Sequence, residues 1–437
     1  MDWRRETKIL FWLTLAFLLV YFMPLGNAEF DEAIYAMFDL LKWYAREHVV
    51  LCLLPAFLIA GVIAVFVSQA SVIKYFGATA KKWIAYSVAS VSGTILAVCS
   101  CTILPLFSSI YKRGAGLGPA ITFLYSGPAI NILAIILTAR ILGIEMGLAR
   151  VIGAVVFSIV IGFAMSFIYR KEEQEKAEQQ MNIVPPPEKR PMWQTAFHFF
   201  TLVLILVFAN WGQPESNTGT WYLIWSNKWV ITGFFGLMLV FSLIYILKIK
   251  WYLVISVGVL TGFSAFISSS PLLPVIVGIF GVSAISLSDK KNEDNPEWII
   301  SSWDFTKQII PLLAIGVVIA GFLLGSTHDD INYAGVIPNE WVTWLVGGNS
   351  LASNFFASIV GAFMYFATLT EVPILQGLIA SGMGKGPALA LLLAGPSLSL
   401  PNMLVIRDVI GTKKTLIYVF LVVIMATSSG IFYGSIF

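Results

Sequence analysis

Long apolar runs, separated by short charged segments, make up most of this chain. An α-helix needs about 20 apolar residues to cross the hydrocarbon core of a bilayer. The pattern therefore predicts an all-α polytopic membrane protein with about 11 transmembrane helices. We expect these full spans near residues 9–26, 47–69, 116–139, 151–169, 194–211, 229–247, 251–269, 271–287, 309–327, 386–405 and 415–434.

Two further apolar segments, 84–111 and 350–380, each carry a proline and end at glycine-rich residues. They could cross the membrane fully or turn back as re-entrant hairpins. Cytoplasmic loops are enriched in Lys and Arg. Hairpins place most of the 27 Lys and Arg residues on one side, whereas full crossing divides them almost evenly. We therefore predict two re-entrant hairpins, with the N-terminus and residues 170–190 in the cytoplasm and the 328–341 loop outside.

Residues 93–128 and 361–396 align without a gap at an offset of 268. Most matching pairs are Gly or Pro, which dictate the path of the backbone. The pairs are Gly93/Gly361, Thr102/Thr370, Pro105/Pro373, Gly114/Gly382, Gly116/Gly384, Gly118/Gly386, Pro119/Pro387, Ala120/Ala388, Leu124/Leu392, Gly127/Gly395 and Pro128/Pro396. Interrupted segments at corresponding positions of two halves indicate a transport site. Because the predicted topology orients the copies oppositely, we expect inverted-topology repeats; a duplication kept only for packing is the alternative.

This division predicts four regions. They are an N-terminal span with a surface amphipathic helix (1–46), repeat 1 with hairpin 84–111 (47–169), a cytoplasmic linker with accessory helices (170–308), and repeat 2 with hairpin 350–380 (309–437). Apolar residues share one helical face over 30–44, which predicts a helix lying on the outer surface. Residues 172–192 are rich in Glu, Lys and Gln and predict a solvated linker without a packed core. The run at 9–26 could be a signal peptide, but its length and the spans that follow favour a retained span.

Composition excludes several classes of protein. Hydrophobic residues make up 58% and charged residues 12%, about half the charged share of a soluble domain. The net charge of +3 is too small and scattered to indicate nucleic acid, and three cysteines inside apolar segments exclude a disulfide framework. The sequence has neither a Walker A pattern nor a His-Glu-x-x-His pattern. We expect neither an enzyme nor a bound cofactor.

The first hairpin carries Cys99 and Cys101, two residues apart, ahead of Pro105. Residues two apart point away from each other in a helix but the same way in extended backbone. Proline disfavours helix at the preceding residue, so a break here could bring both sulfurs onto one cavity wall. Two thiols favour soft ions, such as trivalent arsenic or a monovalent copper-like ion. The alternative is that both are small buried residues in a tightly packed hairpin.

The matching place in the second hairpin has no sulfur and carries Thr370 and Glu371. A carboxyl group deep in the membrane costs about 2.5–3.5 kcal/mol on insertion scales. Glu371 is therefore a candidate proton carrier or cation ligand. Alternatively, it sits at a wet mouth of the hairpin.

Polar residues accompany the Gly-Pro pairs that interrupt the helices after the hairpins. A proline leaves the carbonyl four residues earlier unpaired, and in a bilayer such groups need protein or a water-filled cavity. Asn131, Ser397 and Asn402 could satisfy them or contact substrate. With Thr102, they complete the predicted substrate site. The expected backbone breaks and hinges are Pro105, Gly127, Pro128, Pro373, Gly395 and Pro396.

Four stretches resemble the predicted-permease family that includes ArsP. They are Cys99–Phe107, Tyr111–Ala120, Ser126–Asn131 and Gly395–Asn402. Characterised members of that family export trivalent organoarsenicals such as methylarsenite, and a membrane-embedded cysteine pair is implicated. The resemblance implies that Cys99 and Cys101 correspond to that pair, although a serine separates them here and the best-studied members have adjacent cysteines.

We therefore expect a secondary-transporter-like permease of the cytoplasmic membrane, which exports a small molecule or metalloid. The substrate would lie between the hairpin tips near the middle of the bilayer. A channel or a membrane subunit of a larger complex is the alternative. Apart from substrate and lipid, the sequence indicates no partner, and it leaves the oligomeric state open.

Overall fold

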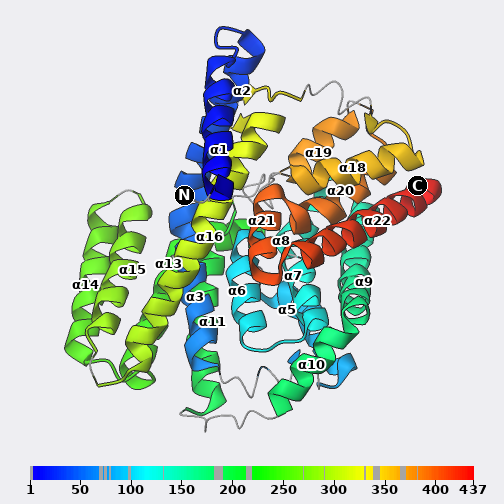
Figure 1. Ribbon diagram of the computed structural model, residues 1–437. Helices are drawn as coiled ribbons and strands as arrows, with labels where there is room; N and C mark the ends of the chain where they lie inside the picture. Colours follow the sequence, from blue (N-terminus) through cyan, green and yellow to red (C-terminus); the bar gives the residue numbers. More distant parts are fainter. Residues whose placement is uncertain are drawn as a thin grey trace.

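The computed structural model describes residues 3–67, 72, 76–77, 80–96, 100–130, 132–181, 190–212, 219–268, 270–289, 291–328, 331–337, 345–364, 371–380 and 382–437. These residues are predominantly helical (Figure 1), which confirms the predicted class. One short antiparallel hairpin pairs β1 (Ser326–His328) with β2 (Ile331–Tyr333).

Six helices in the described part of the chain are long and apolar enough to cross a membrane. They are Val49–Phe66, which joins the end of η1 (Ala45–Leu53) to α3 (Leu54–Phe66), α9 (Ile144–Ile168), α11 (Met192–Ala209), α13 (Lys228–Tyr245), α16 (Asp294–Leu324) and α22 (Thr412–Ile436). A seventh results if α20 (Lys385–Leu398) and α21 (Leu400–Ile410) form one span bent by 47°. α1 (Trp3–Tyr21) has 19 residues, but four of its first six are charged. Shorter helices are α12 (Thr220–Ser226), α14 (Trp251–Ile267), α15 (Leu272–Leu287) and α18 (Leu351–Phe363). The described residues thus hold six or seven candidate spans. The number is smaller than the 11 expected because several expected spans are short or broken.

Two sets of five helices have the same order and nearly the same bounds at an offset of 268 residues. The first set is α5 (Lys82–Leu96), α6 (Ser100–Lys112), α7 (Leu117–Ala129), α8 (Ile132–Ile141) and α9; the second is α18, α19 (Glu371–Ala380), α20, α21 and α22. Adding the offset to the bounds of α9 gives those of α22. Two left-handed glycines recur as well, Gly114 with Gly382 (φ 101° and 105°) and Gly143 with Gly411 (φ 101° and 85°). Figure 1 shows the two sets packed side by side.

In each set, two helix backbones cross at a pair of glycines. A Cβ atom on Gly162 of α9 would lie 2.7 Å from the carbonyl oxygen of Gly118 of α7. A Cβ atom on Gly430 of α22 would lie 2.7 Å from the carbonyl oxygen of Gly386 of α20. Side chains do not fit at such distances, so glycine allows both pairs of helices to pack backbone against backbone.

Replacing Gly430 by alanine is expected to lower the free energy of unfolding by about 1–3 kcal/mol, the usual range for overpacking. The added methyl group meets a backbone carbonyl of α20, which cannot rotate away as a side chain could. Thermal unfolding of the detergent-solubilised protein measures the loss. Gly236→Ala in α13 is the matched control, since nothing lies within 4 Å of its Cβ position. Equal unfolding temperatures for wild type and Gly430→Ala would contradict the close crossing.

Helices α7 and α20 end soon after their Gly-Pro pairs. α7 ends one residue after Pro128, and α20 ends two residues after Pro396. α8 and α21 then begin at Ile132 and Leu400. Because each proline lacks an N–H donor, the helix loses a hydrogen bond where it ends.

The break expected at Pro105 is corrected by the structure. α6 begins at Ser100 and runs through Pro105, which loses only one helical hydrogen bond there. Pro373 is the third residue of α19, where a missing N–H has no cost because first-turn N–H groups lack a helical partner anyway. Both helices therefore tolerate their prolines.

The amphipathic helix expected over residues 30–44 is present and is part of a longer packed helix. α2 (Ala28–Tyr44) runs directly into η1 and α3. Its residues Ala33 and Ala36 are buried, while Phe38 on the expected membrane face is 58% exposed. A Cβ atom on Gly321 of α16 would lie 2.9 Å from the Cα of Met37, so small residues let α2 and α16 pack closely. The boundaries expected at residues 46 and 308 therefore fall inside continuous helices.

Part of the expected solvated linker also forms a helix, α10 (Arg170–Met181). Its Glu173 Oε2 accepts a hydrogen bond of 2.9 Å from the N–H of Leu117, the first residue of α7. A carboxylate is favourable at a helix N-terminus because of the partial positive charge there. The neighbouring Glu172 forms an ion pair with Lys414 of α22. These two carboxylates attach α10 to one helix from each set; residues 182–189 lie outside the described residues.

Candidate functional site

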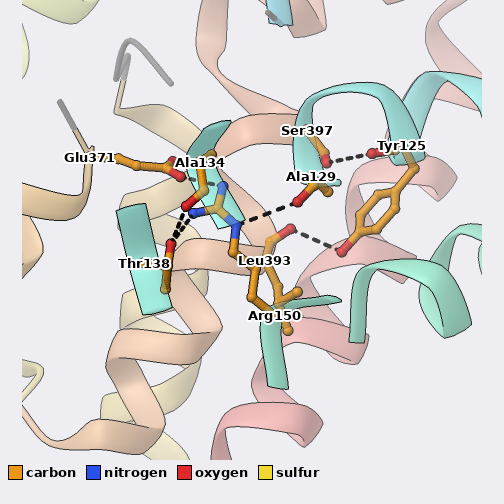
Figure 2. A network of polar contacts seen from close by, with 8 residues as sticks. All are labelled: Tyr125, Ala129, Ala134, Thr138, Arg150, Glu371, Leu393 and Ser397. Carbon is orange, nitrogen blue, oxygen red and sulfur yellow. Dashed lines mark hydrogen bonds and ion pairs between the residues drawn. The ribbon is translucent and has the colours of Figure 1, made fainter. Parts of the chain in front are cut away.

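A buried ion pair joins the two sets of helices (Figure 2). Arg150 lies near the start of α9, and Glu371 is the first residue of α19. Nη2 of the guanidinium contacts Oε1 of the carboxylate, and the side chains are 0% and 1% exposed. Charged groups inside a membrane protein are tolerated when they are paired. The pair therefore fixes one set of helices against the other.

Arg150 also contacts both segments of the broken helix α7–α8. Its Nε donates a hydrogen bond of 3.4 Å to the carbonyl of Ala129, the last residue of α7. Its Nη1 donates to Thr138 Oγ1 of α8 at 2.9 Å, and the Thr138 hydroxyl donates to the Ala134 carbonyl at 2.7 Å. A carbonyl at a helix end has no intrahelical partner. The guanidinium thus satisfies a backbone group that the break leaves free.

The second set repeats this contact with a neutral side chain. Tyr418 of α22 stands 268 residues after Arg150, and Ser397 of α20 stands 268 residues after Ala129. The Tyr418 hydroxyl donates to the Ser397 carbonyl at 3.5 Å. Each set therefore uses its last helix to bind a carbonyl near its helix break, by a guanidinium in one and a phenol in the other.

Tyr125 of α7 connects the last turns of α7 and α20, which precede the two breaks (Figure 2). Its hydroxyl donates a hydrogen bond of 3.0 Å to the carbonyl of Leu393 in α20, a residue 268 positions along the chain. In the other direction, the Ser397 hydroxyl donates to the Tyr125 carbonyl at 3.4 Å. Residues that occupy equivalent positions in the two sets are thus in contact with each other.

The structure brings some of the predicted site residues into this network and leaves others undetermined. Glu371 and Ser397 belong to it, and Thr102 is buried in α6. Three predicted residues lie outside the described residues: Cys99, Asn131 and Thr370. Cys101 is the second residue of α6, and the side chain of Cys101 is not among those described. The predicted cysteine site therefore stays a prediction.

The start of α21 carries two buried polar atoms without a hydrogen-bond partner among the described residues. They are Ser399 Oγ and Asn402 Oδ1, and each residue is 2% exposed. A buried polar atom left unpaired is unfavourable, so this position suits a ligand that donates hydrogen bonds. Within the described ranges, no group of three or more His, Cys, Asp or Glu side chains could hold a metal ion.

Sequence patterns do not predict the roles of Arg150, Thr138 and Tyr125. Arg150 stands just before the span expected at 151–169, so the sequence pattern places it in a short loop outside the hydrocarbon. The observed helix begins earlier, at Ile144, and makes Arg150 a charged residue inside an apolar span. That position is the signal that would have identified it, because intramembrane charges mark functional sites. The partner of Tyr125 is a backbone carbonyl, which no sequence pattern indicates.

The chain is similar to a family of known proteins. The family model ArsP_1, described as a predicted permease, matches residues 34–435. The chain is 42% identical to the UPF0718 protein MJ0584 of Methanocaldococcus jannaschii over 399 residues, which cover 90% of this chain and 93% of that protein. It is 27% identical to the UPF0718 protein YraQ of Escherichia coli over 141 residues, or 32% and 36% of the two chains. No solved structure matches the chain.

Proposed function

Because the chain belongs to the predicted-permease family and is a multi-pass membrane protein, we propose that it is a secondary transporter that works by alternating access. It resides in the cytoplasmic membrane with its N-terminus in the cytoplasm, and its two sets of helices are inverted-topology repeats. In such transporters, broken helices meet near the middle of the membrane and hold the substrate there.

Several observations support the repeat. The bounds of α9 and α22 differ by the same 268 residues that separate Tyr125 from Leu393. A residue can touch its own equivalent only near the axis that relates two halves. The hydrogen bond between Tyr125 and Leu393 therefore supports a two-fold axis that passes between the broken helices.

The observation that carries the proposal is the buried ion pair between Arg150 and Glu371. At the 268-residue offset, the equivalent positions hold Tyr418 and Ile103. When the two halves exchange conformations, the corresponding contact forms between these two neutral residues. A neutral contact lacks the attraction of a buried ion pair. The ion pair therefore stabilises one access state over the other, and the pair must separate in each transport cycle.

Separation of the pair requires another partner for each charge. Protonation of Glu371 neutralises the carboxylate. The neutral side chain then leaves Arg150, which frees the guanidinium. We assign to Glu371 the role of coupling proton movement to transport. Arg150 stays attached to the break of α7–α8 through Ala129 and Thr138, so opening moves α19 away from α9.

The substrate lies at the two breaks. Cys99, Cys101 and Thr102 face it from the first hairpin and Thr370 and Glu371 from the second, with Asn131, Ser397 and Asn402 close by. Asn402 Oδ1, buried and unpartnered among the described residues, supports this placement. The family resemblance and the two thiols favour a trivalent organoarsenical or another thiol-seeking species, which the protein exports.

An efflux assay with methylarsenite tests the substrate class. Sensitive cells that express the protein are expected to accumulate less of the compound than cells with an empty vector, and uptake into everted vesicles should saturate. Uptake that rises linearly with concentration would indicate a channel instead. Wild-type protein that protects against neither methylarsenite, inorganic arsenite nor other thiol-seeking agents would reject this substrate class.

Cysteine variants test the thiol ligands separately. Cys99→Ser and Cys101→Ser are each expected to lose most of the protection, because a hydroxyl is a poor ligand for a soft ion. Cys52→Ser is the matched control, since Cys52 is buried in η1 outside the proposed site. Full protection by both hairpin variants would reject the thiol ligands and leave the permease intact.

A further inference from the structure

A cavity of about 600 Å³ lies among the accessory helices, away from the ion pair. Helices α13, α14 and α15 form its outer wall, and α3, α11 and α16 form the wall on the side of the core. Figure 1 shows α14 and α15 at the edge of the molecule, beyond α13. We propose that this cavity is a binding site for one acyl chain of a bilayer phospholipid.

The wall on the core side is buried and apolar. It includes Leu58 of α3, Leu202 of α11 and Trp298 of α16, which are all buried. The indole N–H of Trp298 donates a hydrogen bond of 2.8 Å to the Leu58 carbonyl, so its polar atom is satisfied within the wall. The wall therefore offers a hydrocarbon surface to whatever occupies the cavity.

Three glycines of the outer wall have open space at their Cβ positions. Gly233 and Gly236 of α13 and Gly262 of α14 line the cavity, and nothing lies within 4 Å of their Cβ positions. Glycine in a membrane helix usually lets a neighbouring backbone approach, as Gly118 and Gly162 do in α7 and α9. Here the missing side chains leave space instead. Glycine is also a poor helix former, so its repeated use on this face is consistent with space for a ligand.

The position of the cavity determines its occupant. The outer faces of α13 and α14 carry exposed apolar side chains such as Phe234 and Val259, as expected for helices in contact with lipid. An unfilled space forfeits the dispersion contacts of all the atoms that line it. Hydrocarbon is the apolar material in excess around these helices, and a volume of this size is in the range of ligand pockets.

One end of the cavity suits a lipid head group. Thr232, Ser268 and Ser270 line it where α13 begins and α14 ends. Trp229 lines the same end, and the ammonium group of Lys228 lies 5.3 Å from its ring centroid. Tryptophan and lysine are typical of the membrane interface. An acyl chain along α13 therefore places the phosphate, which all phospholipids share, near a cation and several hydroxyl groups.

Native mass spectrometry of protein reconstituted with phosphatidylglycerol tests the site. After a detergent wash that removes surrounding lipid, the wild type is expected to retain one phospholipid. The double variant Gly236→Leu/Gly262→Leu fills the cavity and should retain at least tenfold less. Val259→Phe adds bulk to the lipid-facing side of α14 outside the cavity, and it should retain as much as the wild type.

Several results would overturn the proposal. They are a wild type without retained phospholipid, a filled variant that keeps as much as the wild type, and a retained molecule that is a detergent or another apolar compound. If the filled variant does not fold, phosphatidylglycerol with a photoreactive group at the end of its acyl chain provides a second test on the wild type. After the same wash, crosslinks are expected at cavity residues such as Val240, Val257 and Ile279. Crosslinks confined to outward residues such as Phe234 and Val259, which do not line the cavity, would also overturn the proposal.

Discussion

Replacing Arg150 by methionine is expected to destabilise the protein by about 3–5 kcal/mol, the usual range for removing one partner of a buried ion pair. The loss is large because Glu371 is left buried without a counter-charge. The carbonyl of Ala129 and the hydroxyl of Thr138 also lose their hydrogen-bond partner. Unfolding of the detergent-solubilised protein, followed by circular dichroism, measures the change.

Two further variants identify the cause of this loss. The double variant Arg150→Met/Glu371→Met should recover much of the stability, because replacing a buried pair by apolar residues is often neutral or stabilising. Arg407→Met removes an exposed arginine of α21, and it should change the stability by less than about 1 kcal/mol. If Arg150→Met loses no more stability than Arg407→Met, the ion pair does not hold the two halves together.

Replacing Glu371 by glutamine is expected to reduce transport at least tenfold. Glutamine keeps the shape and a hydrogen bond to Arg150 but removes the charge, so the state with the ion pair loses its advantage over the opposite state. A tenfold change in the balance of two states corresponds to about 1.4 kcal/mol, which is small beside the cost of breaking a buried pair. Initial rates of efflux at several pH values are the measurement.

The pH profile separates a coupling role from a structural one. If Glu371 carries the proton, the residual transport by Glu371→Gln loses the pH dependence of the wild type. Glu145→Gln is the matched control, because Glu145 is an exposed carboxylate at the start of α9, and it should keep both rate and profile. An unchanged rate and an unchanged profile in Glu371→Gln would exclude Glu371 as the proton carrier.

Glycine and proline made much of the backbone predictable. The helix ends after Pro128 and Pro396, and the left-handed turns at Gly114 and Gly382, follow from residues whose conformational preferences act locally. Pro105 shows the limit of this reasoning. Its effect depends on where the helix begins: Pro105 is the sixth residue of α6 and forfeits one helical hydrogen bond without ending the helix, whereas Pro373 in the first turn of α19 forfeits none.

Long-range contacts were not predictable in the same way. Helix α2, which contains Phe38, has an apolar face. Contact with Gly321 of α16 nevertheless decides which residues of α2 are buried. In the sequence, the carboxylates of α10 resemble a solvated charge run. In the structure, Glu173 accepts a hydrogen bond from Leu117 and Glu172 forms an ion pair with Lys414. In both cases the partner comes from a distant part of the chain.

The sequence by itself determined that this protein crosses a membrane, because bilayer insertion depends on local hydrophobicity. It also determined the repeated pattern of helix breaks and singled out Glu371 as a candidate, since a carboxyl group in an apolar segment is unfavourable wherever it lies. Only the tertiary structure decided that Arg150 neutralises it and that Tyr418 takes the equivalent place in the other half. The partner of a buried charge is set by the packing of helices far apart in the chain, and that packing has no local pattern.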